Sequence, residues 1–566
     1  MDGGAWARLW QRNAVRIDGD GRRTQDFTYA RWRQRRDAGV PDPGSAAVTG
    51  ITYLGHAGMA IEAEGLRVLV DPWFSPSGAF LGSWFPYPRN DHLDLTRLVD
   101  VDYLVISHEH ADHFDPHVIE RLPRRTRVLI PRYPAPIFRD LLSGVCANPI
   151  TELEPWEKYP LGESGAWVMA IPEPSPRYHD AALLFSLAGR AVLNCNDAML
   201  TAEQARRAKH LVGGRIDLML LQAAGASWHP MCYAYPPDEI RRIAMEKRVA
   251  KLRGVQRLVR ATGPELAVPF AGPPCFLDPE LFQHNWVLRQ EDGAFIDAEA
   301  AVAWLSEHLP RQRWVDFRPG DALDLDTCAV TRDPISAKFD YSTGREDYLA
   351  RYAEDRAEQI RHFKDEHPEP EGDLYERFAA YFAKLGMLSP YFLTRIDMTV
   401  RFEVSGDAGG LWDVRITPEG IDVVHADPSA RVEYQIKVAG RWVDAVLTER
   451  AGWEDLFLSL RVELDRDPDV HNSYLITFLK FADAVALDAV EAYETGRDES
   501  ERIVVEDGGQ RYEIARYCPH AGADLTIGGI VEDGKLRCLG HNLEFDLETG
   551  ACINARCDPL PTRRLD

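Results

Sequence analysis

The stretch VDYLVISHEHADH, residues 101–113, joins a run of apolar residues to a cluster of metal-ligand side chains. Its first half is typical of a buried β-strand, because short apolar runs rich in branched residues favour fully buried strands. Its second half carries imidazole and carboxylate groups, which together suit zinc, iron or manganese. Side chains that alternate along this loop are expected to serve two metal positions, the first taking His108 and His110 and the second taking Asp112 and His113.

The segments around this H-x-H-x-D-H box resemble the metallo-β-lactamase fold. The likeness lies in two opening strands, a later strand and a hairpin: ITYLGHAG (51–58), LRVLVDP (66–72), WVMAIP (167–172), ALLFSL (182–187) and AVLNCND (191–197). It implies a domain of the α/β class over residues 48–320, built as an αββα sandwich. It also implies that Asp197 is the carboxylate that bridges two metals.

The third ligand of the first metal stays open. The resemblance implies that it follows the strand ending at 172 and precedes the hairpin, where Glu173 and His179 compete for the role. Histidine is usual there in hydrolases. A carboxylate would favour iron and oxygen chemistry, because a harder donor supports the oxidised metal.

The last ligand departs from the family pattern. The family places a His in a V-P-x-H loop, whereas this chain has VPFAG at 268–272. His229 or His284 could replace it, or the second position is weak and the site holds one iron. His56 and His117 lie near the box, and they could support the ligands from behind or be structural.

A second cluster of ligand residues lies in the loops CPHAGAD (518–524) and CLGHNL (538–543). Each loop pairs a Cys with a His, and glycines and an Asp-Gly pair between the loops predict a hairpin. This spacing is typical of a Rieske [2Fe–2S] cluster, in which two thiolates hold one iron and two imidazoles the other. A Cys2His2 zinc site is the alternative, although zinc fingers keep Cys and His in separate pairs. The predicted cluster ligands are Cys518, His520, Cys538 and His541.

This segment resembles the Rieske domains of bacterial ring-hydroxylating oxygenases and their ferredoxins. High-potential relatives carry an additional Cys in each loop, and neither loop here has one. The resemblance therefore implies a low-potential cluster that feeds electrons to an oxygenase. A small all-β Rieske domain is expected over 500–566, after a charged linker at 494–501.

Length and composition limit the other function classes. A chain of 566 residues is too long for one core, so several domains are expected. The net charge of −24 disfavours nucleic acid as a partner. The N-terminal residues lack the apolar stretch of a secretory signal, and no run of apolar residues is long enough to span a membrane. Nine scattered Cys residues indicate reduced thiols, so a cytoplasmic protein is expected.

The remaining residues divide into an N-terminal extension, 1–47, and a middle domain, 321–495. The middle domain is expected to be α+β, with two helices over 346–385 and an antiparallel sheet after 398. Two further helices are expected near 451–466 and 473–493. The pattern resembles a sterol-carrier-like domain, which implies a ligand-holding lobe; a spacer or a dimer interface is the alternative.

Taken together, the chain resembles the CMP-N-acetylneuraminate hydroxylase family, which combines a Rieske domain with a metallo-β-lactamase-like domain. The segments VLNCND (192–197) and PFAG (269–272) carry this likeness. In that family the Rieske domain comes first, whereas here it comes last. The redox chemistry is therefore expected to carry over, and the sugar-nucleotide substrate is not.

The resemblance implies a non-heme iron monooxygenase. A ferredoxin or reductase would reduce the Rieske cluster, which would pass electrons to iron held by the H-x-H-x-D-H box and Asp197. O2 would then hydroxylate or N-oxygenate a small polar metabolite, within one chain or across a homo-oligomer. Aromatic residues expected near the metal rim are Trp228, Tyr233, Tyr235 and Phe270. The alternatives are a zinc-dependent hydrolase with a redox-sensing Rieske domain and a non-catalytic electron carrier.

Overall fold

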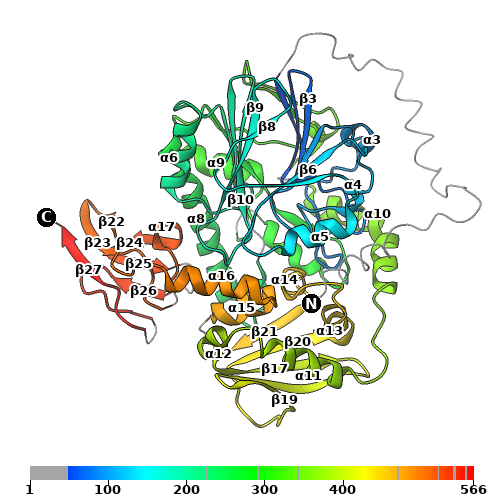
Figure 1. Cartoon of the computed structure of the whole chain (residues 1–566), viewed down its shortest axis with the longest axis vertical. Helices are drawn as coiled ribbons and strands as arrows, with labels where there is room; N and C mark the ends of the chain where they lie inside the picture. Colours follow the sequence, from blue (N-terminus) through cyan, green and yellow to red (C-terminus); the bar gives the residue numbers. More distant parts are fainter. Residues whose placement is uncertain are drawn as a thin grey trace, which may run out of the picture.

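The computed structural model describes residues 49–224, 227–289, 292–340, 343–467, 471–520, 522–538, 543–554 and 557–565. The extension expected over 1–47 and the predicted cluster ligand His541 lie outside these ranges. The described chain forms a large β-sandwich, a middle α+β part and a small β-rich part (Figure 1).

Two sheets face each other in the sandwich. The first has the order β16-β15-β1-β2-β3-β5-β6-β7, with β1 (Gly50–Gly55), β2 (Gly58–Ala63), β3 (Leu66–Val70), β5 (Tyr103–Val105), β6 (Arg127–Pro131), β7 (Ile150–Leu153), β15 (Ala322–Asp324) and β16 (Ala329–Thr331). The second has the order β13-β12-β11-β10-β9-β8, with β8 (Tyr159–Leu161), β9 (Ala166–Pro172), β10 (Ala181–Leu187), β11 (Arg190–Asn194), β12 (Leu218–Gln222) and β13 (Leu266–Phe270). Apolar side chains of both sheets, such as Val68 and Phe185, share one buried core.

Helices cover the outer faces of both sheets. On the first sheet lie α3 (Leu95–Leu98), α4 (Pro116–Ile119) and α5 (Ile137–Val145), and on the second α6 (Ala202–Leu211), α8 (Pro237–Thr262) and α9 (Ala298–His308). Smaller elements complete this part: β4 (Trp84–Pro86), α7 (Trp228–Met231), β14 (Pro274–Phe276), η1 (Phe282–Leu288) and η2 (Ser336–Lys338). The central strands are apolar on both faces because a sheet covers one side and helices cover the other. This αββα arrangement confirms the predicted fold class.

The sandwich continues past the boundary expected at 320. Strand β15 pairs antiparallel with β1, and β16 pairs with β15, so both complete the first sheet. This pairing has no long-range signal in the sequence, because strands as short as these carry little periodicity.

The middle part is a five-stranded sheet with helices on it. Its order is β19-β18-β17-β20-β21, with β17 (Met398–Ser405), β18 (Gly410–Thr417), β19 (Gly420–His425), β20 (Tyr434–Ala439) and β21 (Val462–Arg466). Its helices are α10 (Arg345–Asp365), α11 (Leu374–Leu385), α12 (Pro390–Ile396), α13 (Gly440–Leu447), α14 (Trp453–Leu458), α15 (Ser473–Phe481) and α16 (Ala484–Thr495).

Three expectations for this part were wrong. The sheet is mixed, because β20 returns to the other side of β17 and runs parallel to it. The helix expected over 451–466 ends at Leu458, and its second half forms the edge strand β21. The helix expected over 473–493 is two helices, since Ala482 takes a left-handed conformation and Asp483 caps the next helix.

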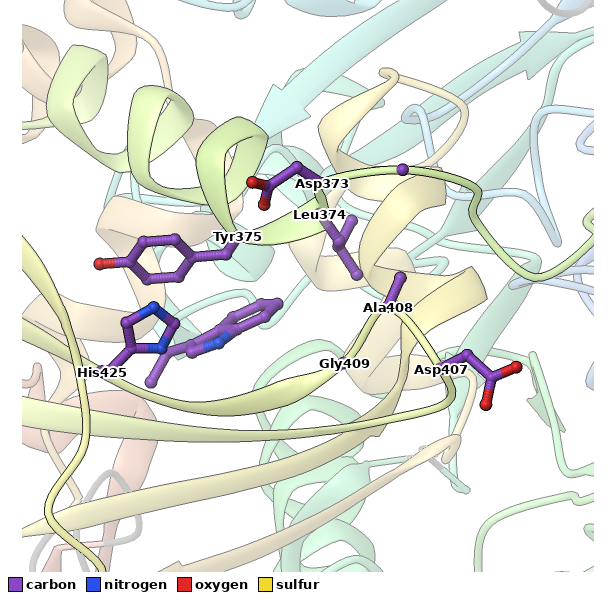
Figure 2. A pocket seen from close by; sticks show the side chains of 9 residues that line it. Asp373, Leu374, Tyr375, Asp407, Ala408, Gly409 and His425 are labelled. Carbon is purple, nitrogen blue, oxygen red and sulfur yellow. The ribbon is translucent and has the colours of Figure 1, made fainter.

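A surface recess of about 400 Å³ lies between the start of α11 and the β17–β18 turn (Figure 2). Tyr375 stacks on His425 with a ring separation of 4.1 Å, and the Trp412 ring lies 5.7 Å from Tyr375. These three rings pack against one another along one side of the recess.

The C-terminal part contains two three-stranded sheets. One has β22 (Arg502–Asp507), β23 (Gln510–Ala515) and β27 (Thr562–Leu565); the other has β24 (Gly529–Glu532), β25 (Lys535–Cys538) and β26 (Leu543–Asp546), preceded by the short helix α17 (Leu525–Gly528). A small apolar core between the sheets includes Ile514, Leu536 and Phe545. This part lies beside α8 and at the end of α16 (Figure 1). Across the described residues, no helix combines the length and the apolar character that a membrane crossing requires.

Candidate metal centre

The H-x-H-x-D-H box forms the loop that leaves β5. Asp71, at the end of the neighbouring β3, is fully buried and accepts hydrogen bonds from the backbone N–H and the hydroxyl of Ser107, both at 2.7 Å. These bonds fix the start of the loop, so the ligand side chains emerge where two parallel strands end side by side. His108, Asp112 and His113 are buried there.

A first group of potential ligands contains His108, His110 and Asp180. The His108 Nε2 and His110 Nδ1 atoms lie 2.9 Å apart, and Asp180 Oδ1 lies 3.5 Å from His108 Nε2. Asp180 directly precedes β10, so the second sheet carries its side chain to the box on the first.

A second set surrounds His113. Its Nε2 atom lies 3.5 Å from Asp197 Oδ1 and 3.9 Å from Asp112 Oδ2, and His56 Nε2 lies 2.8 Å from the same Asp112 oxygen. Asp197 follows β11 and also forms a group with His108 and His113. The ligand atoms of each group lie within 4.8 Å of one another, so the groups define two adjacent positions.

The polar atoms at these positions fit metal ions. Among the described residues, four buried ligand atoms lack a hydrogen-bond partner: Asp112 Oδ1, His113 Nε2, Asp180 Oδ1 and Asp197 Oδ1. Buried polar atoms without partners are costly, and a cation shared by carboxylates and imidazoles removes that cost. The donor set, three carboxylates and four imidazoles, suits two ions of iron, manganese or zinc.

The charges in this centre shift several pKa values. Burial disfavours the charged ring of His113, but Asp112 and Asp197 outweigh burial and hold the pKa of His113 well above its usual range. Burial lowers the pKa of His108, and the other histidines lower it further. Burial raises the pKa of Asp180. A group of mutually perturbed residues in a buried loop is typical of a functional site.

His108 and His113 are oriented by hydrogen-bonding partners behind their rings. Ser107 Oγ lies 2.9 Å from His108 Nδ1, and Asp71 Oδ2 lies 3.1 Å from His113 Nδ1. Such partners fix the tautomer and direct the other ring nitrogen to a metal. His108 and His113 would therefore bind through Nε2.

His110 is oriented by the middle part of the molecule. Its Nε2 atom lies 3.2 Å from Glu454 Oε2 of α14, and Glu454 also pairs with Lys480 of α15 at 2.9 Å. Burial opposes the charge on His110, but Glu454 outweighs it and raises the pKa of His110 to about 9. His110 would thus bind metal through Nδ1. Glu454 has no recognisable signal in the sequence, because 344 residues separate it from its partner His110.

The structure places both proposed third ligands beside the centre but in neither of its positions. Glu173 accepts a hydrogen bond from the Met199 backbone N–H at 2.6 Å. His179 Nδ1 lies 2.9 Å from Glu109 Oε1, and its ring stacks on Tyr133. Asp180, the residue after His179, occupies the place expected for them.

His229 and His284 also lie apart from the described ligand groups. His229 Nε2 lies 3.3 Å from Arg466 Nη2, and the His284 ring packs on Phe276. The loop that replaces V-P-x-H instead contacts His56, whose carbonyl accepts a hydrogen bond from the Ala271 N–H at 3.0 Å. His56 therefore lies against the loop that lacks the family ligand, and its imidazole faces Asp112, with Nε2 2.8 Å from Oδ2.

The remaining expected residues lie outside the described ligand groups. His117 follows the cap of α4, and burial lowers its pKa to about 4. Of the four aromatic candidates, Trp228 packs on Phe457, Tyr233 stacks on Tyr235, and Phe270 packs on Tyr53.

The predicted Rieske ligands Cys518 and Cys538 are buried in the C-terminal core. A tight turn forms the first loop: the Gly522 N–H donates to the Cys518 carbonyl at 2.8 Å, and the Cys518 N–H donates to the Ala523 carbonyl at 2.9 Å. His520 lies at the tip of this turn. The two thiols and the His520 imidazole fit the donor types of the predicted [2Fe–2S] cluster.

Comparisons with known proteins agree with both sites. Residues 50–182 match the Beta-lactamase superfamily domain, and residues 480–563 match the Rieske [2Fe-2S] domain. The fold and sites therefore define a protein that joins a metallo-β-lactamase-like domain to a C-terminal Rieske domain, as the sequence predicted.

Relatives of similar length identify the family. A protein of Mycolicibacterium smegmatis that is named as a Rieske 2Fe-2S iron-sulfur protein is 30% identical over 91% of this chain and 100% of its own length. The chain belongs to this family of Rieske 2Fe–2S iron–sulfur proteins. The cytidine monophosphate-N-acetylneuraminic acid hydroxylase of Danio rerio is 23% identical over 75% of this chain and 70% of its own length. The diiron β-hydroxylase CmlA from Streptomyces venezuelae is 19% identical over 51% of this chain and 55% of its own, with a TM-score of 0.33, too low to establish a shared fold.

Proposed function

We propose that this protein is an oxygenase in which the Rieske domain supplies electrons to iron in the lactamase-like centre. The observation that carries the proposal is the ligand set of that centre, in which Asp112, Asp180 and Asp197 add three carboxylates to the imidazoles. Hard carboxylate donors support oxidised iron. An electron-carrying domain in the same chain also needs an acceptor, and relatives that match this chain are named as hydroxylases.

The residues of this chain would hold the reacting groups in place. His108, His110 and Asp180 would hold one iron, and His56, Asp112 and His113 a second, with Asp197 between them. Bound iron would supply O2 activation, and the Rieske cluster would supply single electrons. The protein contributes ligand orientation through Asp71 and Glu454, and burial that excludes water from the site.

The proposed reaction balances with an external reductant. A ferredoxin or reductase would deliver two electrons one at a time, and these with two protons and one O2 would convert R–H into R–OH and water. The substrate would be a small polar metabolite, hydroxylated at carbon or oxygenated at nitrogen.

Metal analysis combined with turnover tests the proposal. Protein purified without oxygen should contain about four irons per chain, two in the cluster and two in the centre. The Cys538→Ser variant should lose the [2Fe–2S] cluster and should no longer consume O2 in the presence of a reductant. Its lactamase-like metal centre should keep its iron. Two irons with one or two zincs, or metal-dependent hydrolysis that survives Cys538→Ser, would instead identify the zinc hydrolase alternative.

A further inference from the structure

The C-terminal end of α16 lies between the two metal-binding regions. Glu494, in the last turn of this helix, is buried and accepts hydrogen bonds from Arg177 Nε at 2.7 Å and Nη2 at 2.5 Å. Arg177 lies three residues before Asp180, in the loop between β9 and β10. One face of Glu494 is thus tied to the loop that carries a candidate metal ligand.

The other contact of this helix end is with the Rieske domain. Arg497 Nη1 donates to the carbonyl of Gly522 at 2.5 Å, inside the first cluster loop. The guanidinium of Arg497 also lies 5.1 Å from the ring centre of Tyr517, the residue before Cys518. A Cβ atom at Gly522 would lie 2.2 Å from Arg497 Nη1, so the loop closes directly on this side chain.

The two contacts meet at one residue. Arg497 Nε donates to the backbone carbonyl of Glu494 at 3.3 Å, and the Glu494 carboxylate holds Arg177. Gly522, Arg497, Glu494 and Arg177 are therefore connected within one chain by hydrogen bonds and by the covalent bonds of Arg497 and Glu494. We call these four residues the α16 bridge.

Helix α8 fixes the Rieske domain from a second side. Glu246 pairs with Arg537 at 2.7 Å, Arg253 pairs with Glu532 at 3.1 Å, and Arg257 donates to the Ile527 carbonyl at 3.0 Å. Spacings of seven and four residues place the three α8 side chains on one face of the helix. Attachment at both α8 and α16 sets the orientation of the Rieske domain against the metal domain (Figure 1).

We propose that the α16 bridge carries electrons from the cluster to the metal centre of the same chain, so that a single chain is a complete oxygenase. This inference rests on the proposed function. Each transfer oxidises the reduced cluster by one electron and reduces the iron at Asp180 by one electron, and the ferredoxin or reductase restores the cluster. Electrons have a shorter path through packed, hydrogen-bonded groups than around or across a gap filled with solvent. The bridge therefore favours electron transfer within the chain.

Mixing two inactive variants tests whether one chain suffices. Cys538→Ser removes the cluster and His110→Ala impairs the metal centre, so each variant alone should consume no O2 with reductant. If electrons stay within a chain, the mixture of the two variants should also consume no O2, whether the chains are mixed after purification or co-expressed. Recovery of activity in the mixture would show transfer between chains and would overturn the proposal.

Single-turnover spectroscopy tests the bridge itself. After stoichiometric reduction, the absorption and electron paramagnetic resonance of the cluster report its re-oxidation on mixing with O2 and substrate. Arg497→Ala should slow re-oxidation by about tenfold or more with unchanged iron content and cluster spectrum, and Arg497→Lys should have a smaller effect. Arg502→Ala is the matched control, because Arg502 is exposed and donates to linker carbonyls.

The results separate the two proposals. Wild-type re-oxidation rates in Arg497→Ala and Arg497→Lys would rule out the bridge as the path. Wild-type rates in His110→Ala would mean that electrons do not go to the metal centre, and would overturn the proposed function independently of the bridge.

Discussion

At the residue scale, the metal centre depends on Asp180, which the sequence does not distinguish from two neighbouring residues that could also bind metal. Glu173, His179 and Asp180 are all ligand types within eight positions of one loop. Neither Glu173 nor His179 belongs to a group of potential ligand atoms in the described residues, whereas Asp180 Oδ1 lies 3.5 Å from His108 Nε2 and has no hydrogen-bond partner there. The position of the side chain in the folded loop, and not the residue type, therefore decides which residue can bind metal.

Replacing Asp180 tests this assignment. Asp180→Asn removes the charge and should lower the iron content from about four toward three per chain, because the first position loses its carboxylate. Plasma emission spectroscopy after gel filtration measures the change. Glu173→Gln and His179→Gln are the controls, and metal loss in either of them with retention in Asp180→Asn would reverse the assignment.

Glu454 should affect the iron affinity of the centre although it does not bind the metal itself. Glu454→Gln keeps the size of the side chain but weakens its hold on the His110 ring, so iron affinity should fall by about 10–100-fold. Competition with a chelator measures the affinity. Glu449→Gln, in the half-buried turn before α14, should leave the iron affinity unchanged. Equal affinities in wild type and Glu454→Gln would exclude the orienting role.

At the element scale, each ligand-bearing loop begins where a strand ends. β3, β5 and β11 deliver Asp71, the H-x-H-x-D-H box and Asp197, and β25 delivers Cys538. Strands buried on both faces are read easily from apolar runs, whereas mixed segments are not. The segment 451–466 contains both helix- and strand-forming residues, and its contacts with the sheet edge at β20 decide the outcome.

The first cluster loop should be sensitive to any side chain at Gly522. Gly522 has a φ of +68°, and a Cβ atom there would collide with Arg497. Gly522→Ala should destabilise the loop by about 1–3 kcal/mol and lower cluster occupancy. Visible absorption and thermal unfolding measure both effects. Gly528→Ala meets no atom within 4 Å and should behave as wild type; full occupancy in Gly522→Ala would contradict the close contact.

At the scale of the whole molecule, the three parts are joined by buried polar contacts. Asp278, which is fully buried in the sandwich, pairs with Arg461 of the middle part at 2.7 Å and with Lys364 of α10 at 2.8 Å. The Trp84 indole also donates to the Leu458 carbonyl at 2.7 Å. The middle part is therefore attached to the sandwich through α14 and the residues after it, and the same helix supplies Glu454 to the metal centre.

Asp278 should matter more to stability than any surface ion pair. Asp278→Ala removes the buried partner of Arg461 and Lys364, which then keep only the exposed Glu280, and should cost about 3 kcal/mol in the free energy of unfolding. Denaturant unfolding measures this cost. Asp100→Ala, which removes an exposed partner of Arg67, should cost much less, because exposed ion pairs are screened by solvent. Similar costs for both would contradict the buried role of Asp278.

The Asp278 carboxylate should also make the stability of the protein depend on pH. Burial disfavours its charge, but Arg461 outweighs burial and lowers the pKa of Asp278 below its usual value. A carboxyl group with a lowered folded-state pKa stabilises above its unfolded pKa, and that stability disappears as the pH falls through the folded pKa. Wild type should therefore lose more stability than Asp278→Asn between pH 5 and pH 3, which is about the range in which ordinary carboxyl groups titrate. If the free energy of unfolding fell equally with pH in wild type and in Asp278→Asn, this contribution of Asp278 would be excluded.

The sequence by itself determined the αββα class, the Rieske cluster loop and the H-x-H-x-D-H box, because short-range spacing encodes strand ends and paired ligands. Only the tertiary structure decided that Asp180 faces the box, that His56 lies where the family ligand is missing, and that Glu454 supports His110. It also decided how α16 joins the two metal-binding regions. These features depend on contacts between residues up to hundreds of positions apart, and such contacts arise from packing, which leaves no local pattern in a single chain.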